Sequence, residues 1–453
     1  MKKILYMMLG LALLTSACSK DDPAAPDNLI NFSASTQGIE STSTSADVTL
    51  TLSRAADVAV PVTINLVTTG VTYGTEFTTT PAATNNAITV TVPAGSNTVS
   101  FKINKAEGLF LNGGESVTFN IATAGSPILV GATNSTKVSF AAITSDGTTL
   151  TLNGGEGGAA AVNSVFVDLS ANKQTSVLRN SWDLGFYAGD DFRVIINNTT
   201  AASVIAVDKT DLTQVSESDI TISNLNLGYG QGSFSIIDDV NGDLTKTAIP
   251  QVSATDAENK VYVINRVGGS ATTSPAADLY KIRVLRANGG YSLQYAKLNE
   301  TTFKTISIAK NSTFNFNYVS FEKGAEVEVE PTKDHWDMQW TYSIYYTGTI
   351  PYAFSDLVFT NSLGGITSAE VLTSTVSYDA YASANVATTT FTTSRNTMGS
   401  AWRATTGTVG VKTDRFYVIK DAAGNVYKLK FNSFTTQDGG TRGYPVIQYA
   451  LVK

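Results

Sequence analysis

The feature that most constrains this fold is an internal duplication in the C-terminal two thirds of the chain. Trp182 precedes Tyr295 by 113 positions, and Trp336 precedes Tyr449 by the same number. Self-similarity at a fixed spacing indicates repeated structural units. It predicts two like units, 147–299 and 300–453, which could pack as one pseudo-symmetric structure or as two domains. Four motifs occur twice in the same order: Ser181-Trp182-Asp183-Leu184 and His335-Trp336-Asp337-Met338; Val261-Tyr262-Val263-Ile264 and Phe416-Tyr417-Val418-Ile419; Leu279-Tyr280-Lys281-Ile282-Arg283-Val284 and Val426-Tyr427-Lys428-Leu429-Lys430-Phe431; Tyr291-Ser292-Leu293-Gln294-Tyr295-Ala296 and Pro445-Val446-Ile447-Gln448-Tyr449-Ala450.

Short alternating runs of polar and β-branched residues fill the chain, separated by Gly, Asn and Asp. The run Asp47–Leu52 shows the alternation, which is typical of a strand with one buried face. Helical periodicity is absent over any long stretch, so the sequence predicts an all-β protein. Regularly spaced strands over 28–145 predict an N-terminal β-sandwich. Its clearest strands are Ala46–Leu52, Val60–Leu66, Ala87–Val92, Thr98–Ile103 and Ser116–Ile121.

The N-terminal sandwich resembles Calx-beta domains in the order of three short motifs: Gly74-Thr75-Glu76-Phe77, Val92-Pro93-Ala94-Gly95, and Gly114-Glu115 leading into a strand. Calcium-binding members of that family supply several carboxylates, because Ca²⁺ takes six to eight oxygen ligands. The acidic residues here are sparse and scattered, which favours a metal-free spacer over a calcium site. They are Asp47, Asp57, Glu76, Glu107 and Glu115.

Each repeated unit is expected to open with a strand, Val165–Leu169 or Tyr318–Phe321, followed by the Trp-Asp strand. A hairpin turn is expected at Asp421–Asn425. The Trp-Asp strand with its Asn-rich turn, followed by the Tyr-Val-Ile and Tyr-Lys strands, resembles the HmuY family over about 147–453. The resemblance implies a β-rich lipoprotein at the cell surface of the Bacteroidetes type, which binds haem and passes it to an outer-membrane receptor.

The resemblance also implies a pair of His or a pair of Met as haem ligands. His335 is the only histidine of the chain, so two histidines from one molecule cannot ligate the iron. The candidate donors are therefore His335, Met338, Met398 and the tyrosines. Met338 is expected to share one strand face with Trp336 and Trp340, as core residues would. Met398 lies among polar residues, and we expect it in an exposed loop.

The second unit is also rich in aromatic residues, which makes it the more probable pocket of the two. Aromatic surfaces suit flat ligands such as tetrapyrroles and also sugar rings, although the same residues would serve a core. The pocket candidates are Trp336, Trp340, Tyr342, Tyr345, Tyr346 and Tyr352.

Charge and missing motifs exclude several classes of function. The formal net charge is −7, which argues against binding to nucleic acid or to an anionic membrane surface. No Gly-x-Ser-x-Gly elbow or phosphate-binding glycine loop occurs, so the chain is expected not to be an enzyme. Glu326, Glu328 and Glu330 alternate along one predicted strand, and we interpret them as a solvated face.

The N-terminus is typical of an exported lipoprotein, with a signal peptide over 1–17 and a tether over 18–27. Lys2 and Lys3 precede an apolar run of about 11 residues, against the roughly 20 that a spanning helix needs. Cys18, the only cysteine, follows small residues as in a bacterial lipobox, where the thiol is lipidated. Ser19–Asp22 resembles an export signal to the outer face of the outer membrane, although an ordinary polar tether would look similar.

The sequence therefore predicts a surface lipoprotein of the outer membrane that captures haem or a related tetrapyrrole without catalysis, and an outer-membrane receptor as its partner. Two alternatives stay open. One is a surface protein that binds glycan or a protein. The other is a structural accessory subunit of an outer-membrane complex.

Overall fold

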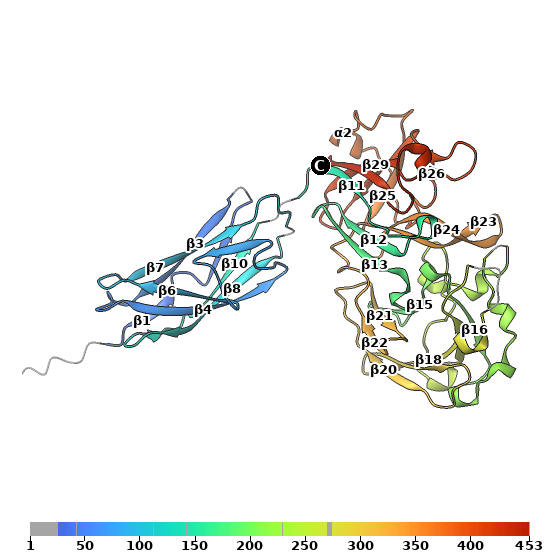
Figure 1. Cartoon of the computed structure of the whole chain (residues 1–453), viewed down its shortest axis with the longest axis horizontal. Coiled ribbons are helices and arrows are strands. Elements are labelled where there is room, and N and C mark those ends of the chain that lie inside the picture. Colours follow the sequence, from blue (N-terminus) through green and yellow to red (C-terminus); the bar gives the residue numbers. More distant parts are fainter. Residues whose placement is uncertain are drawn as a thin grey trace, which may run out of the picture. The chain divides into compact units, whose positions relative to one another are not determined.

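The chain forms two compact units, residues 1–142 and 143–453, in the computed structural model (Figure 1). The structure describes residues 26–41, 43–111, 113–141, 144–228, 230–269 and 274–452. Cys18, the predicted signal peptide and most of the predicted tether lie outside these residues. Among the described residues, no helix is both long and apolar enough to span a bilayer.

The first unit is a sandwich of two five-stranded sheets, which confirms the predicted all-β fold and its N-terminal sandwich. One sheet has the strand order β5 (Phe77–Thr80), β7 (Thr98–Lys105), β3 (Ser45–Leu52), β1 (Leu29–Phe32) and β9 (Leu129–Val130). The other has the order β2 (Thr36–Ile39), β10 (Ser135–Phe140), β8 (Ser116–Ala124), β4 (Val60–Thr69) and β6 (Ala87–Val92).

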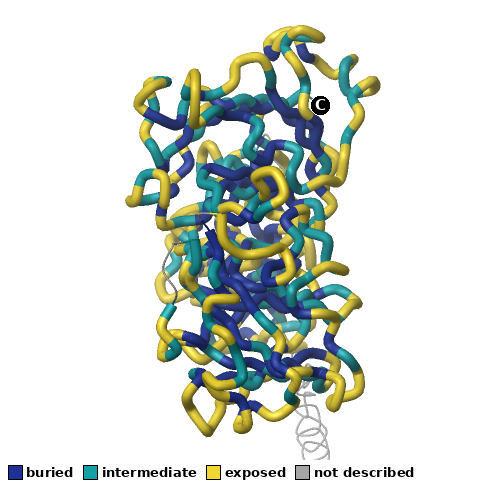
Figure 2. Tube along the Cα trace, turned by 90° about the vertical axis from the view of Figure 1, so that its right-hand side faces the viewer, coloured by how far each residue is buried: buried dark blue, intermediate teal, exposed yellow. Residues whose placement is uncertain are grey.

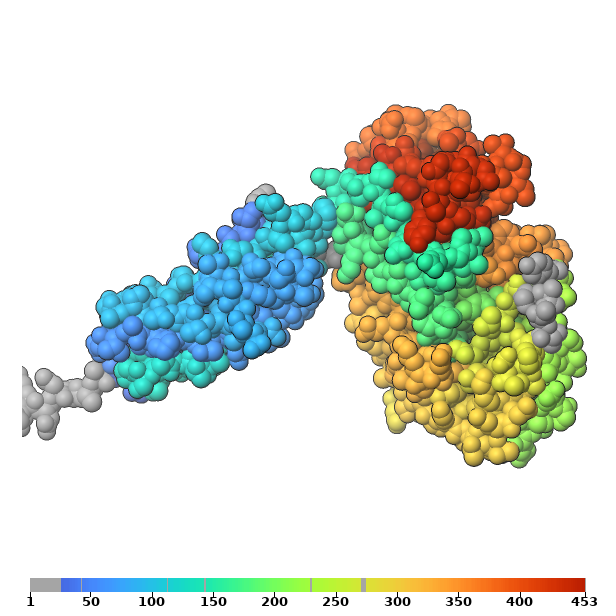
Figure 3. Space-filling view, in the orientation of Figure 1, coloured from blue at the N-terminus to red at the C-terminus, as the bar shows by residue number. Residues whose placement is uncertain are grey.

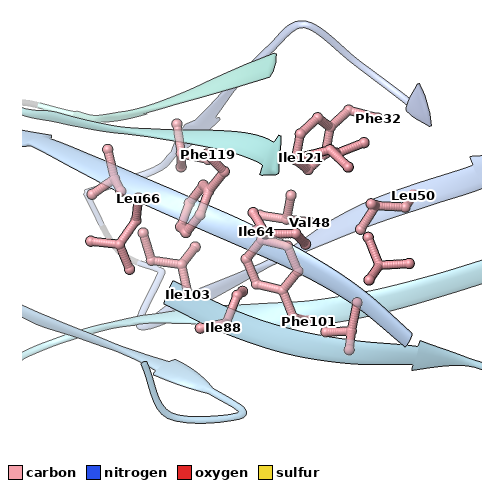
Figure 4. Packing of buried hydrophobic residues seen from close by; sticks show 14 of the residues in the cluster. Phe32, Val48, Leu50, Ile64, Leu66, Ile88, Phe101, Ile103, Phe119 and Ile121 are labelled. Atoms are coloured by element: carbon pink, nitrogen blue, oxygen red, sulfur yellow. The ribbon is translucent and has the colours of Figure 1, made fainter. Parts of the chain in front are cut away.

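Alternation along the strands builds the core of this sandwich. In β4, buried and outward positions alternate from Val60 to Leu66, as the period of two requires. Figure 4 shows the inward side chains of both sheets packed together, with Phe101 against Phe119 at 4.9 Å between ring centroids. Apolar packing between the two sheets therefore accounts for the stability of this unit.

The described residues of the second unit form four larger sheets and one two-stranded ribbon. The first sheet has the order β11 (Gly147–Thr151), β30 (Val446–Leu451), β29 (Val426–Ser433), β28 (Arg415–Lys420) and β25 (Thr367–Leu372). The second is β13 (Lys173–Leu178), β12 (Asn163–Asp168), β23 (Met338–Thr347) and β24 (Ile350–Thr360). The third is β15 (Val194–Ile196), β14 (Leu184–Tyr187), β21 (Phe316–Ser320) and β22 (Ala325–Val327). The fourth is β16 (Ser203–Val207), β17 (Val261–Asn265), β18 (Tyr280–Ala287), β19 (Gly290–Lys297) and β20 (Lys304–Ile308), and the ribbon is β26 (Arg403–Ala404) and β27 (Gly410–Val411).

Helical turns in this unit are short and lie in the connections. The single α-helical turn among the described residues is α2 (Ser383–Val386). The 3₁₀ turns are η1 (Gly158–Ala160), η2 (Arg179–Ser181), η3 (Asn198–Thr200), η4 (Leu212–Gln214), η5 (Glu217–Asp219), η6 (Ile222–Leu225), η7 (Phe234–Ile236), η8 (Leu244–Lys246), η9 (Asp256–Glu258), η10 (Ala276–Asp278) and η11 (Thr436–Asp438). Figure 2 shows the buried stretches running through the interior, with exposed loops around them.

The two repeats exchange their first strands. β11 and β12 open the first repeat but pair with β30 and β23 of the second. β20 and β21 open the second repeat but pair with β19 and β14 of the first. In Figure 3 the teal surface near the start of the unit adjoins the red C-terminal surface. Both repeats therefore fold into one compact unit.

The exchange is held by matching hydrogen bonds around the two Trp-Asp motifs. The amide of Asp183 donates to Val319 O at 2.8 Å, and the amide of Asp337 donates to Val167 O at 2.7 Å. Each motif is also tied down by an asparagine. Asn197 Nδ2 donates to Trp182 O at 2.8 Å. Asn361 Nδ2 donates to Trp336 O at 2.9 Å, so the pseudo-symmetry extends to single hydrogen bonds.

Candidate functional site

A cleft lies where the two Trp-Asp motifs meet, with a cavity volume of about 140 Å³. Trp182 and Trp336 both line it. Neighbouring residues of both repeats complete the wall, among them Ile195 and its repeat equivalent Phe359. The second repeat, expected to be the likelier pocket, shares the wall of this cleft with the first, because strand exchange brings the equivalent segments of both repeats to one place.

Aromatic rings form the floor of this cleft. Trp182 packs edge-to-face on Tyr318, with ring centroids 4.8 Å apart, and Trp336 packs likewise on Phe166 at 5.0 Å. Both tryptophans are 8% exposed. Each pair joins a tryptophan of one repeat to a ring from the first strands of the other. The exchange of strands thus fixes the orientation of the indole rings.

Three buried polar atoms in the wall of the cleft have no hydrogen-bond partner among the described residues. They are the acceptor Asn198 Oδ1 and the donors Trp336 Nε1 and Arg395 Nε. A buried polar group without a partner costs free energy, and such groups are rare in folded proteins. Asn198, Trp336 and Arg395 thus each bring an unpaired polar atom to the wall of the cleft.

Two buried carboxyl groups line the cleft but are hydrogen-bonded to the backbone. Asp238 accepts hydrogen bonds from the amides of Ile196 at 2.8 Å and Ala248 at 3.0 Å. Glu330 Oε1 accepts from the amides of Asn315 at 2.7 Å and Phe316 at 2.8 Å. Burial raises the pKa of each carboxyl to about 7. Both groups therefore brace the walls and change charge near neutral pH.

The burial of Glu330 corrects the interpretation of the three alternating glutamates. Glu330 is 6% exposed, whereas a solvated face was expected. Strand β22 ends at Val327, so the alternation that would place Glu330 beside Glu326 does not continue to it.

The three candidate haem ligands other than the tyrosines do not line the cleft. The side chain of His335 is 44% exposed, and its Nδ1 lies 2.8 Å from Thr332 Oγ1. Met338 and Met398 are fully buried in one core cluster. The predicted exposure of Met398 is wrong. Gly399 pairs with Val358 of β24, so the preceding residue, Met398, lies in that core.

The aromatic pocket candidates divide among three environments. Of the six, only Trp336 lines the cleft. Trp340 packs in the core with Met338, whereas Trp336 lies in another cluster, because it precedes the first residue of β23. The expected shared face of Trp336, Met338 and Trp340 is therefore wrong.

The four tyrosines lie on the hairpin of β23 and β24, and the two exposed ones are Tyr346 and Tyr352. Tyr345 packs against Tyr346 in a tilted arrangement, with ring centroids 4.3 Å apart. Tyr342 lies under the guanidinium of Arg179 at 4.6 Å. The spacing from Trp336 to Asn361 exceeds that from Trp182 to Asn197 by ten positions, so this hairpin is longer than the equivalent segment of the first repeat.

The two Trp-Asp aspartates have opposite electrostatic environments. Asp183 forms an ion pair with Arg266, although burial still raises the pKa of Asp183. The position equivalent to Arg266 holds Asp421 in the second repeat. Burial, together with the charges of Asp168 and Asp421, raises the pKa of Asp337 well above its usual range. Within the described ranges, no three His, Cys, Asp or Glu side chains are grouped as a metal site would require.

Sequence reasoning missed most of the residues that build the cleft. Trp182 was visible only as half of a repeated motif, and Asn197 and Asn361 could have been found by aligning the two repeats. Arg395 carried no signal, since a single arginine in a Ser/Thr-rich loop looks like a solvated residue.

Comparison with known families finds that the family model for HmuY protein matches residues 276–449. The match covers the last strands of the first repeat and most of the second, including Trp336-Asp337. This part of the chain is similar to the HmuY family. No curated protein sequence matches the chain.

Similar solved structures are found at low scores. The apo-form Calx CBD1 domain is 11% identical, with a TM-score of 0.22, and covers 25% of this chain and 96% of that one. A putative carbohydrate binding protein from Bacteroides ovatus ATCC 8483 is 11% identical, with a TM-score of 0.19, over 59% of this chain and 67% of that one. A two domain protein with unknown function from Bacteroides fragilis NCTC 9343 is 11% identical, with a TM-score of 0.20, over 79% and 98%. At these TM-scores, none of the three supports a functional assignment.

Proposed function

We propose that this chain is a HmuY-like surface lipoprotein that captures a ring-shaped ligand without chemical conversion. The observation that carries the proposal is that Trp182 and Trp336, from two repeats, line one cleft that also holds unpartnered polar atoms. Aromatic faces with a few polar groups are the usual composition of a small-molecule site. The HmuY match of residues 276–449 makes haem or a related tetrapyrrole the first ligand class.

A tetrapyrrole would be held in this cleft by its faces and edges. None of His335, Met338 and Met398 lines the cleft, so these residues do not supply a pair of axial iron ligands there. The cavity of about 140 Å³ is also smaller than the roughly 300–1,000 Å³ of typical ligand pockets. A tetrapyrrole would therefore enter by one edge, or the cleft would open.

A sugar ring is the second candidate ligand, and the small volume of the cleft favours it. The wall combines indole rings with amides and hydroxyls, among them Asn198, Gln339 and Ser343. Such a wall can stack against one face of a sugar and hydrogen-bond its hydroxyls.

Capture without catalysis is supported by the two carboxyl groups of the cleft. General acid–base catalysis needs a carboxyl within hydrogen-bond reach of the ligand. Asp238 uses both oxygens on backbone amides, and Glu330 uses Oε1 on two of them. Their contacts are those of structural groups.

The test is a titration of the full-length chain in detergent with haem and, separately, with sugars. Haem is followed in the Soret region in both iron oxidation states, and all ligands by tryptophan fluorescence. We expect saturable binding that Trp182→Ala and Trp336→Ala each weaken. Trp402→Phe is the matched control, because Trp402 packs in the core. Binding that both cleft variants leave unchanged contradicts this site.

The N-terminal part fits the role of an anchor and spacer. We propose that Cys18 carries the lipid, that the chain is displayed on the outer membrane, and that the sandwich is a Calx-beta-like spacer. The expected result is membrane release of a Cys18→Ala variant and loss of labelling by radioactive palmitate. Membrane retention of that variant would refute the anchor.

A further inference from the structure

Arg395 is the most unusual polar residue of the cleft. The residue is partly buried, and it lines the cleft. Its Nε has no hydrogen-bond partner. Among the described residues, no carboxylate oxygen lies within the 4.0 Å of an ion pair with its guanidinium, although Asp238 and Asp239 are charged neighbours beyond that distance.

Elements of both repeats hold this guanidinium in place. It lies over the ring of Phe359, 4.3 Å from the centroid. The carbonyl of Arg395 accepts a hydrogen bond from Thr360 N at 2.8 Å. The next residue, Asn396, donates through Nδ2 to Val240 O at 3.1 Å in the first repeat. A Cβ at Gly242 would lie 2.6 Å from Arg395 Cδ, so only glycine leaves room for the arginine stem.

A partly buried cation without a hydrogen-bonded partner is costly, and the fold keeps it charged. Burial lowers the pKa of Arg395 to about 10, which still leaves the guanidinium charged at neutral pH. A charge removed from water is stabilised only by a partner that forms hydrogen bonds with it. The planar guanidinium matches a carboxylate, with two parallel N–H donors for two oxygens.

The acidic residues of the cleft form no hydrogen bond or ion pair with Arg395, and several of their oxygens have other partners. Asp238 and Glu330 accept hydrogen bonds from backbone amides. Asp243 pairs with Lys246 at 2.8 Å. Asp239 Oδ1 accepts from the amides of Asn241 at 2.9 Å and Asp243 at 3.2 Å. Arg395 is thus the charged group whose donors stay available to a ligand.

We propose that Arg395 binds a carboxylate of the captured ligand while Trp182 or Trp336 contacts its ring. This inference rests on the proposed function and narrows the ligand to a ring that carries a carboxylate. Two sources share that chemistry: a uronic-acid sugar, and a tetrapyrrole with its propionates.

The experiment compares acidic and neutral members of each source on the full-length chain in detergent. D-glucuronate is paired with D-glucose by calorimetry, and haem is paired with its dimethyl ester by absorbance. We expect the acidic member of one pair to bind at least about tenfold more tightly than the neutral one. Arg395→Gln should abolish that preference and leave the affinity for the neutral member within about twofold.

Arg286→Gln is the matched control, since Arg286 lies over Phe192 at 4.2 Å and does not line the cleft. It should keep the full preference for the carboxylate, and thermal unfolding shows whether both variants fold. Equal binding of acidic and neutral members, or a preference that survives Arg395→Gln, overturns the role of Arg395 and leaves the capture function standing. Binding of none of the four compounds overturns both.

Discussion

The carboxylate of Asp337 accepts a hydrogen bond of 2.7 Å from the backbone amide of Leu169, a residue of the other repeat. The equivalent bond joins Asp183 to the amide of Phe321 at 2.6 Å. In both cases, the aspartate of one repeat accepts a hydrogen bond from a backbone amide of the other repeat. Their charges differ, because Asp183 has Arg266 beside it and Asp337 has Asp168 and Asp421.

Asp337→Asn should stabilise the chain at neutral and alkaline pH. The pKa of Asp337 is raised in the folded state, so stability falls as the pH rises above about 4, the unfolded pKa, towards the folded value. The amide oxygen can still accept from Leu169 N. We expect a gain of about 1 kcal/mol or more at pH 8 and a smaller one at pH 5, measured by urea unfolding. A loss at both pH values would contradict the electrostatic origin.

Asp183→Asn provides the comparison at the equivalent position. The pKa of Asp183 is also raised, but Arg266 offsets part of the cost of burying its charge. We therefore expect Asp183→Asn to stabilise the chain less than Asp337→Asn in the same urea experiment at pH 8. An equal or larger gain at Asp183 would mean that the Arg266 ion pair contributes nothing.

Binding of an anionic ligand should strengthen as the pH falls from 8 to 6. Asp238 and Glu330 both have a pKa raised to about 7, so each loses its negative charge over this range. Arg395 stays positive, because its pKa is about 10. Affinities for haem or D-glucuronate at several pH values provide the measurement. An Asp238→Asn, Glu330→Gln double variant should flatten the profile, and a profile that rises with pH would contradict the assignment.

Met398→Leu should leave haem titrations unchanged, because Met398 packs in the core away from the cleft. The replacement conserves volume, so its effect on the free energy of unfolding should stay below about 1.5 kcal/mol. Met398→Ala should cost about 2–5 kcal/mol. If Met398→Leu removed the haem spectrum of a folded chain, the thioether would be an iron ligand after all.

Alternation along strands and the repeated motifs were enough to predict much of the fold. The predicted strand Ala87–Val92 has the same bounds as β6, and the turn at Asp421–Asn425 closes with a hydrogen bond from Asp421 N to Asn425 O at 3.0 Å. These features depend on local patterns. The exchange of β12 and β21 could not be predicted. Alternation shows which face of a strand is buried, but it does not show which strand lies beside it.

The candidate site was harder to predict, since it depends on contacts between distant segments. Met398 and Arg395 share one polar loop, yet one side chain enters the core and the other borders the cleft. Local composition cannot show which of the two side chains is buried in the core, because their positions depend on how the loop packs against β24 and the first repeat.

The strand exchange has a consequence for the ancestry of the chain. A gene that carried only one copy of the repeat would encode a protein in which β11 lacks its partner β30 and β12 lacks one of its two partners, β23. Such a protein would have to fold back on itself or assemble with a twin. Once the copies were fused and had exchanged strands, the loss of either copy would have unfolded the other as well. The two copies can therefore diverge in their loops, as the longer hairpin of the second repeat illustrates, but they fold only together.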